Sequence, residues 1–163
     1  MGGVVLNIKN IQWKKLLLCI ALPLAVGGLS ALLTRSSMED FAALNQPPLS
    51  PPGWLFPVVW TILFTLMGIA SYLVLTAPAN HLKSIAGIVY GLQLLFNFFW
   101  SLLFFNGQLY WIAFVWLVLL ELLIFVNMVL FYSISTPAGL LLVPYFLWVA
   151  FAGYLNLGIA LLN

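Results

Sequence analysis

The sequence contains very little charge. Only 5% of its 163 residues are Asp, Glu, Lys or Arg, whereas an ordinary soluble domain carries roughly 25%. Five basic and three acidic residues leave a net charge of +2, too little for a nucleic-acid-binding surface. Because the chain is also 65% hydrophobic, we predict an integral membrane protein whose partner is the lipid bilayer and not a nucleic acid.

Cysteine and histidine are almost absent. Cys19 is the one cysteine, so a disulfide within the chain is excluded and a cysteine-based metal site is not expected. The one histidine, His81, falls in a predicted loop with no second metal ligand near it. The sequence also shows no nucleophile–base pair and no glycine-rich phosphate loop. We therefore expect no metal and no required cofactor, and ligand binding is a better first hypothesis than enzymatic activity.

Long apolar runs dominate the rest of the chain. They lack the alternation of a transmembrane barrel strand, so an all-α bundle is predicted, since only helices and closed barrels span lipid. At 1.5 Å per residue each run gives a helix of about 30 Å, enough to cross the hydrocarbon core. We expect one transmembrane domain over residues 1–163, with helices at about 16–34, 54–76, 83–105, 109–132 and 138–161.

The few basic residues predict the orientation of the bundle. Lys9, Lys14 and Lys15 precede the first span, and Lys83 lies between the second and third spans, on the same side. Arg35 is alone on the other side. Because short cytoplasmic segments are enriched in Lys and Arg, the N-terminus is predicted to be cytoplasmic and the C-terminus to lie on the opposite side.

A proline-rich segment joins the first two predicted spans. Four prolines within residues 47–52 favour an extended backbone, because each fixes its own φ and disfavours helix in the preceding residue. Gly53 then permits a turn, and Pro57 falls in the first turn of the next helix. We expect a stiff strap across a membrane helix, with Trp54 at the interface and Trp60 two turns deeper. Such a segment is typical of a rigid lid over an aromatic pocket.

Aromatic residues are abundant, with seven Trp, six Tyr and thirteen Phe. Trp60 and Phe64 lie one helical turn apart, and so do Trp100 and Phe104. Each pair forms an aromatic stripe on one helix face. The stripes pack helices together or form the wall of a site for a flat aromatic ligand, and the residues leave both interpretations open.

Polar residues inside the predicted spans are few. Gln93 and Asn97 share one helix face and either join helices or supply hydrogen bonds to a pocket. Glu121 is the one ionisable residue deep in a span, where a carboxyl is costly and is a functional hypothesis by default. We expect it to be protonated and hydrogen-bonded to Asn127 or to a residue across the bundle, with proton relay or ligand contact as the functional alternative.

Three separated motifs carry a family resemblance. The most specific is Pro144-Tyr145-x-x-Trp148-x-x-x-Ala152-x-x-Leu155-Asn156. The others are the segment from Leu44 to Trp60 and Gln93-x-x-x-Asn97-x-x-Trp100-Ser101-x-x-Phe104-Phe105, with residues 67–72 also similar. From roughly residue 20 to 160 the chain resembles the translocator protein family, also called the peripheral-type benzodiazepine receptor or tryptophan-rich sensory protein (TspO/MBR) family.

The resemblance implies a five-helix bundle, commonly a homodimer, with a ligand cavity under the loop between the first two helices. Family ligands are porphyrins such as protoporphyrin IX, haem-related tetrapyrroles, benzodiazepine-site drugs and, in animals, cholesterol. Trp60 and Trp148 match the two tryptophans linked to porphyrin binding and its light-dependent breakdown, in which they would be catalytic. The resemblance places these further residues on or near the cavity: Phe41, Pro51, Pro52, Phe64, Asn97, Trp100, Phe104 and Ala152. The dimer would use the small residues Gly87 and Gly91 of the third helix.

The chain also departs from the family pattern. Asp40 and Phe41 stand where the family has Trp-Tyr, and Gln46 replaces its Lys. Losing a tyrosine hydroxyl and a lysine charge would weaken recognition of a porphyrin carboxylate. No Tyr is followed within five residues by Lys or Arg, so the animal sterol motif is not supported. We expect a bacterial cell-membrane protein, or a mitochondrial outer-membrane protein if the source is eukaryotic.

Three functions remain at this point. The first is a membrane receptor or transporter-like protein that binds tetrapyrroles in a tryptophan-lined cavity. The second is an enzyme that degrades porphyrin with light and oxygen, in which the porphyrin supplies the photochemistry. The third is a structural membrane scaffold. The proline-rich lid argues against this function, because a pure scaffold has little use for a rigid lid.

Overall fold

The computed structural model describes residues 11–163, and within them it contains helices and loops but no strand. Five helical stretches are long and apolar enough to cross a membrane, which confirms the predicted all-α, five-helix class. The helices are α1 (Trp13–Thr34), α2 (Met38–Ala43), α3 (Leu55–Thr76), α4 (Leu82–Ser101), α5 (Tyr110–Ile134), α6 (Thr136–Leu141) and α7 (Val143–Leu162). A 3₁₀ turn, η2 (Arg35–Ser37), precedes α2, and a π-helix, η3 (Leu102–Asn106), extends α4.

Helix bounds differ from the expected ones at three places. Helix α1 begins at Trp13 and not near residue 16, and the long loop expected over residues 35–53 contains η2 and α2. The fifth span is two helices, α6 and α7, that meet at Leu142. Pro144 sits in the first turn of α7, and proline interrupts a continuous helix because it lacks an N–H and clashes with the preceding turn.

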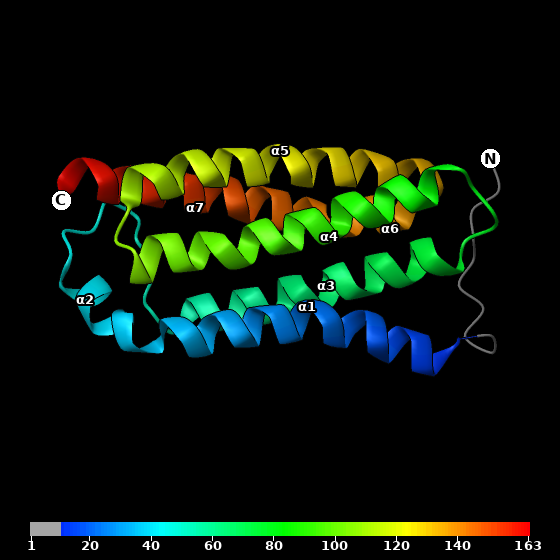
Figure 1. The fold of residues 1–163 in the computed structure, drawn as a ribbon, viewed down its shortest axis with the longest axis horizontal. Coiled ribbons are helices and arrows are strands. Elements are labelled where there is room, and N and C mark those ends of the chain that lie inside the picture. The colour runs from blue at the N-terminus through cyan, green and yellow to red at the C-terminus, as the bar shows by residue number, and fades with distance from the viewer. Residues whose placement is uncertain (1–10) are drawn as a thin grey trace.

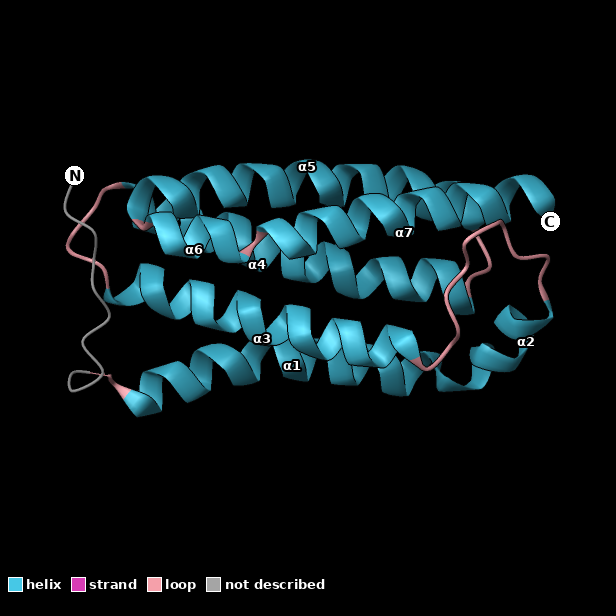
Figure 2. Ribbon diagram, turned by 180° about the vertical axis from the view of Figure 1, so that it is seen from behind, coloured by secondary structure: helices cyan, strands magenta, loops and turns pink. Residues whose placement is uncertain are grey.

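The helices form two groups that run along one axis (Figure 1). In the first group α1 packs on α3, and in the second α5 packs on α4, α6 and α7. Contacts of α3 with α6 and of α1 with α4 join the two groups. The view from behind shows α2, the loop before α3 and the C-terminus at the same end of the bundle (Figure 2). The turn between α3 and α4 lies at the other end.

Two glycines allow α1 and α3 to approach closely. A Cβ added to Gly68 of α3 would collide with the backbone of Cys19 and Ile20 in α1, and one added to Gly27 of α1 would collide with the ring of Phe64. Small residues are the usual means by which membrane helices bring their backbones together. The α1–α3 pair is therefore fixed by close packing.

Residues 44–54, here called the lid, cross the end of the bundle and are attached to α7. Asn163 Oδ1 accepts a hydrogen bond from the Asn45 N–H (2.9 Å), and Asn163 Nδ2 donates to the Asn45 carbonyl (3.1 Å). The Tyr154 hydroxyl donates to the Pro48 carbonyl (2.8 Å). Pro47 packs so closely on Gly158 that a Cβ there would collide with its ring. The lid is thus held along the last turns of α7.

The lid contains two turns: the turn expected at Gly53 is found, whereas the expectation of an extended backbone across the prolines is wrong. The Ser50 N–H donates to the Pro47 carbonyl (3.3 Å), and Leu49 within that turn has φ of 66°, a value uncommon for a residue other than glycine. The Leu55 N–H donates to the Pro52 carbonyl (2.9 Å), which closes a second turn around Gly53. The prolines therefore shape two corners of the lid.

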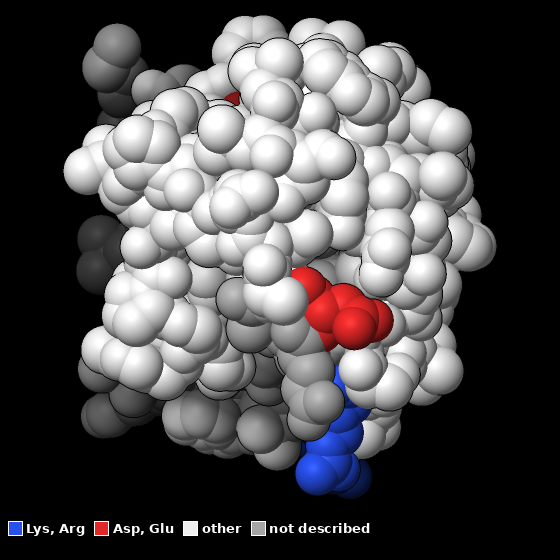
Figure 3. Space-filling model, turned by 90° about the vertical axis from the view of Figure 1, so that its left-hand side faces the viewer, with Lys and Arg blue, Asp and Glu red and all other residues white. Residues whose placement is uncertain are grey.

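The end that carries the lid has a mostly uncharged surface (Figure 3). One acidic and one basic spot lie side by side on that face, and most of the remaining described surface is free of charged side chains.

Candidate ligand-binding site

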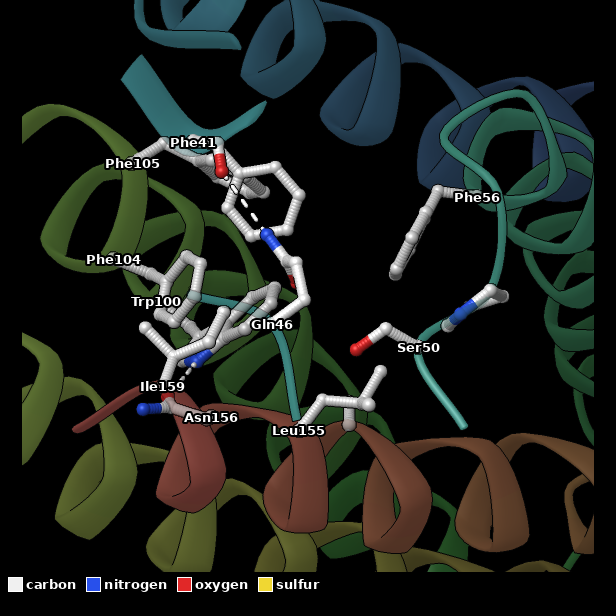
Figure 4. A pocket seen from close by; sticks show the side chains of 12 residues that line it. Phe41, Gln46, Ser50, Phe56, Trp100, Phe104, Phe105, Leu155, Asn156 and Ile159 are labelled. Atoms are coloured by element: carbon white, nitrogen blue, oxygen red, sulfur yellow. Dashed lines mark hydrogen bonds between the residues drawn. The ribbon is translucent and has the colours of Figure 1, made fainter. Parts of the chain in front are cut away.

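A pocket lies under the lid, between α2, α3, α4, η3 and α7 (Figure 4). Its walls are mostly aromatic and aliphatic, with a few polar groups. Twelve residues line it: Phe41, Gln46, Ser50, Pro51, Phe56, Trp100, Phe104, Phe105, Ala152, Leu155, Asn156 and Ile159. Its free volume of about 30 Å³ holds a water molecule or two, whereas pockets for drug-sized ligands measure roughly 300–1,000 Å³. A larger ligand requires side chains to move.

Phe41 is the centre of the aromatic wall. Its ring centroid lies 5.3 Å from that of Phe105, 5.9 Å from Phe104 and 6.5 Å from Phe56. Trp100 stacks on Phe104 at 5.4 Å. These distances fall in the range of favourable edge-on and offset aromatic contacts. Phe41 therefore joins α2, α3 and η3 around the pocket.

The polar groups of the pocket are mostly paired with each other or with backbone. Asn156 Oδ1 accepts a hydrogen bond from Trp100 Nε1–H (3.1 Å), and its Nδ2 donates to the Tyr110 carbonyl (2.8 Å). Gln46 Nε2 donates to the Phe41 carbonyl (3.0 Å), which draws the lid onto α2 (Figure 4). The glutamine at the family's lysine position thus serves an internal contact.

A second aromatic group lies deeper in the bundle. Trp60 stacks on Phe64 (5.3 Å) and meets Tyr145 edge-on (6.1 Å). The Tyr145 hydroxyl accepts a hydrogen bond from Asn97 Nδ2 (3.0 Å). This group joins α3, α4 and α7 about one helical turn below the lid pocket.

Trp148 lies beside the lid pocket. Its ring packs on Phe56 (6.1 Å), which lines the pocket, and on Phe151 (5.7 Å). Its Nε1–H is buried and has no hydrogen-bond partner among the described residues. A buried tryptophan N–H normally has a partner, so this donor is available to an acceptor on a ligand.

The structure divides the predicted cavity residues into two sets. Phe41, Pro51, Trp100, Phe104 and Ala152 line the pocket. Pro52, Trp60, Phe64, Asn97 and Trp148 do not, although all but Pro52 belong to the deeper aromatic group or border it. The residues missed by the cavity prediction are Gln46, Ser50, Phe56, Phe105, Leu155, Asn156 and Ile159. All of these except Ile159 lie within the quoted motifs, which were the available signal.

The remaining candidate residues lie away from the pocket. Both carboxylate oxygens of Glu121 are buried without a partner in residues 11–163, so the expected hydrogen bond to Asn127 or across the bundle is not found. Gly87 and Gly91 lie on the exposed face of α4, where an added Cβ would meet nothing within 4 Å. Within the described part of the chain, no group of three or more His, Cys, Asp or Glu residues is arranged to hold a metal ion.

Comparison with known proteins places these features in context. Residues 19–162 match the model of the TspO/MBR family. The chain is 42% identical over 156 residues to the tryptophan-rich protein TspO of Chlorobaculum tepidum, covering 94% of this chain and 99% of that protein. It is 32% identical to the tryptophan-rich sensory protein of Cereibacter sphaeroides, over 94% of each chain, and 35% identical to the translocator protein of Bos taurus, over 83% of this chain and 82% of that one. The fold, the motifs and these similarities agree, and the chain belongs to the TspO/MBR family of membrane proteins.

Proposed function

We propose that the protein is a membrane receptor or transporter-like protein that binds a flat tetrapyrrole, such as protoporphyrin IX or haem, beneath the lid. The observation that carries the proposal is the buried, unpartnered Nε1–H of Trp148 beside an aromatic-lined pocket. Aromatic walls supply contact area for a flat ring system, and one placed donor orients it. The names of relatives, translocator protein and tryptophan-rich sensory protein, are compatible with this role.

The pocket must widen to take such a ligand, and Phe56 is the side chain placed to allow it. Phe56 stands on the first turn of α3, with its ring between Phe41 of the pocket wall and Trp148. Its two aromatic contacts are edge-on, at 6.5 and 6.1 Å. Rotation of this ring would join the pocket to the space beside the Trp148 N–H. We therefore infer that the ligand displaces Phe56 and leaves the lid attached to α7.

The proposal includes the surroundings of the protein. The exposed Gly87–Gly91 face of α4 offers a second copy a surface on which backbones can approach closely, which supports a homodimer through this helix. The basic residues at the start of α1 favour a cytoplasmic N-terminus, and the similarity to bacterial relatives favours a bacterial cell membrane.

The test is a titration of the purified protein with protoporphyrin IX in the dark, in which quenching of tryptophan fluorescence reports binding. Trp148→Phe keeps a ring but removes the N–H, and loss of a hydrogen bond worth about 1.4 kcal/mol weakens binding about tenfold. Trp13→Phe is the matched control, because Trp13 is 61% exposed at the start of α1. Equal dissociation constants for the wild type and both variants would remove Trp148 from the site.

Illumination of the same samples tests the enzymatic alternative. The deeper array of Trp60, Tyr145 and Trp148 places oxidisable rings next to the proposed site, and an excited porphyrin supplies the photochemistry itself. A new absorbing product that needs both Trp60 and Trp148 would make the protein a porphyrin-degrading enzyme. Saturable quenching without a product would favour binding or transport.

A further inference from the structure

Buried polar atoms without partners are concentrated in one part of the bundle. Seven such side-chain atoms occur among the described residues, and all lie on α4, α5 or α7: Tyr90 Oη, Gln93 Nε2 and Oε1, Glu121 Oε1 and Oε2, Asn127 Oδ1 and Trp148 Nε1. The residues described in α1 and α3 contribute none. Trp148 borders the lid pocket through Phe56, and the other six atoms lie on α4 and α5.

Burying these polar groups without hydrogen-bond partners costs free energy. Gln93 is 0% exposed and Asn127 1%, and a buried polar group without a partner costs about 1–3 kcal/mol. Lipid offers no hydrogen bonds to relieve that cost. Native interiors pair nearly all buried polar atoms, with water or a ligand where protein groups are missing. The concentration of unpaired atoms therefore indicates a site that holds water or a ligand.

Glu121 is the ionisable member of this region. Its neighbours one turn before and after it, Leu117 and Ile124, are buried in the core face of α5. Leu117 packs on Gly153 of α7, so this stretch of α5 faces α7. Both carboxylate oxygens are buried although the residue as a whole is partly exposed, and the carboxyl lies near the Tyr145 hydroxyl.

No described side chain provides a positive charge beside Glu121. Helices α4, α7, α6, η3 and α3 pack on α5. The titratable residues of these elements and of α5 itself are Tyr72, Lys83, Tyr90, Tyr110, Tyr132, Tyr145 and Tyr154, together with Glu121. Lys83 lies in the first turn of α4, where its Nζ bonds the Ala77 and Leu75 carbonyls. The charge of a Glu121 carboxylate is therefore balanced only by a bound cation.

We propose that Glu121 is a proton-binding site within a hydrated region bounded by Gln93, Asn127 and Tyr145. A proton fits better than a metal ion, because one carboxylate stands alone and no cluster of acidic, His or Cys ligands exists in residues 11–163. This activity is separate from tetrapyrrole binding and from the family properties described above.

The region has a route to the lid end. Tyr90, Gln93, Asn97 and Trp100 follow one another at helical spacing along the buried face of α4. Trp100 and its partner Asn156 line the lid pocket, and Asn97 is bonded to Tyr145. These polar side chains line a path toward the lid pocket, and protons would move along it through water, because amide and indole N–H groups do not relay protons themselves. Because Tyr145 also packs on Trp60, the charge of Glu121 acts one side chain away from that tryptophan.

The test uses the ligand-free protein in nanodiscs, so it does not depend on porphyrin binding. Infrared spectra across a pH series report the C=O stretching band of a protonated carboxyl. We expect a wild-type band, in addition to those that Glu39, Asp40 and the C-terminal carboxyl give at low pH, that disappears as the pH is raised. That additional band should be absent in Glu121→Gln and persist in Asp40→Asn, whose carboxyl is exposed. A band unaffected by Glu121→Gln would overturn the proposal, as would a band that responds to sodium in place of choline at fixed pH.

Tryptophan fluorescence supplies the second readout. We expect the tryptophan fluorescence of the wild type to change over the same pH range as the infrared band, because Trp60 packs on Tyr145 near Glu121. The fluorescence of Glu121→Gln should not change over that range. If Glu121→Gln does not fold, the infrared spectrum of Glu121→Asp provides the test. A band that moves to a new frequency in that variant supports the site, and an unchanged band contradicts it.

Discussion

The two helix groups of this protein are held together in different ways. Between α1 and α3 the contact is made by shape, with Gly27 and Gly68 each facing atoms that leave no room for a Cβ. The hydroxyls of Thr61 and Thr65 bond the backbone of their own helix, α3, at 2.7 and 2.8 Å. This pair of helices therefore contains close packing but little polar chemistry.

The group of α4, α5 and α7 contains the polar chemistry. Hydrogen bonds from side chains connect one helix to another, from Asn97 to Tyr145, from Trp100 to Asn156 and from Trp116 to the Phe96 carbonyl. The unpaired buried atoms lie in this group as well. Under the proposed function, α1 and the body of α3 would form a fixed wall, and α4, α5 and α7 would supply the polar groups that meet the ligand. Four predictions test this division, from the largest expected effect to the smallest.

Close packing at Gly68 should contribute most to stability. In Gly68→Ala the new methyl group collides with the backbone of Ile20, which cannot rotate away as a side chain could. Overpacking of this kind costs about 1–3 kcal/mol or more. We expect a clear drop in the thermal unfolding temperature in detergent. Gly28→Ala is the control, because nothing lies within 4 Å of its added Cβ. Equal unfolding temperatures for the two variants would refute close packing at Gly68.

The hydrogen bonds of Asn156 should come next. Asn156→Leu leaves the Trp100 N–H without a partner and removes one bond to the Tyr110 carbonyl, and buried bonds between membrane helices are worth about 0.6–2 kcal/mol each. We expect the free energy of unfolding to fall by about 1–3 kcal/mol. Thr65→Val is the comparison, since Thr65 bonds only its own helix and its loss should be nearly neutral. A larger effect for Thr65→Val would reverse the proposed division.

Removal of the Phe56 ring should affect ligand entry more than stability. Phe56→Ala opens the pocket toward Trp148, so protoporphyrin IX should associate several-fold faster in stopped-flow quenching. Phe125→Ala is a control, because Phe125 is 49% exposed and packs on Phe146 away from the pocket. Unchanged association in Phe56→Ala would show that the ligand does not pass this ring.

The lid attachment should give the smallest effect. Tyr154→Phe removes one hydrogen bond to the Pro48 carbonyl, and a bond of this kind contributes about 0.5–1.5 kcal/mol. If the lid remains on α7 during binding, the association and dissociation rates of the porphyrin should change by less than about threefold. Only part of the hydrogen-bond energy would then contribute to the activation free energy. Tyr132→Phe, with its side chain 53% exposed on α5, is the control. A large acceleration of both rates in Tyr154→Phe would mean that the lid must leave α7.

The sequence was informative where hydropathy and helical spacing decide the outcome. Five spans followed from apolar length, and the Trp100–Phe104 stripe predicted a shared helix face, which the stacked rings confirm. Spacing fixes a face but not the neighbour across it. Trp60 and Phe64 stack as their spacing suggested, yet they lie deeper than the lid pocket.

Other features had no signal of their own. Phe56 and Ile159 line the pocket, but an apolar side chain in an apolar chain looks the same whether it faces lipid, a core or a cavity. The break at Leu142 did have a local signal, because Pro144 cannot continue a helix through the preceding turn. The pairing of Trp100 with Asn156 joins residues 56 positions apart, which no local pattern predicts.

The most direct test of the central claim is hydrogen–deuterium exchange with and without protoporphyrin IX in the dark. The account predicts that the ligand changes exchange of the backbone amides in the lid, residues 44–54, and in η3, whose Phe104 and Phe105 line the pocket. The turn between α3 and α4, at the opposite end of the bundle, should be unchanged. A change confined to that turn or to the outer face of α1, with none in the lid or η3, would contradict a ligand site beneath the lid.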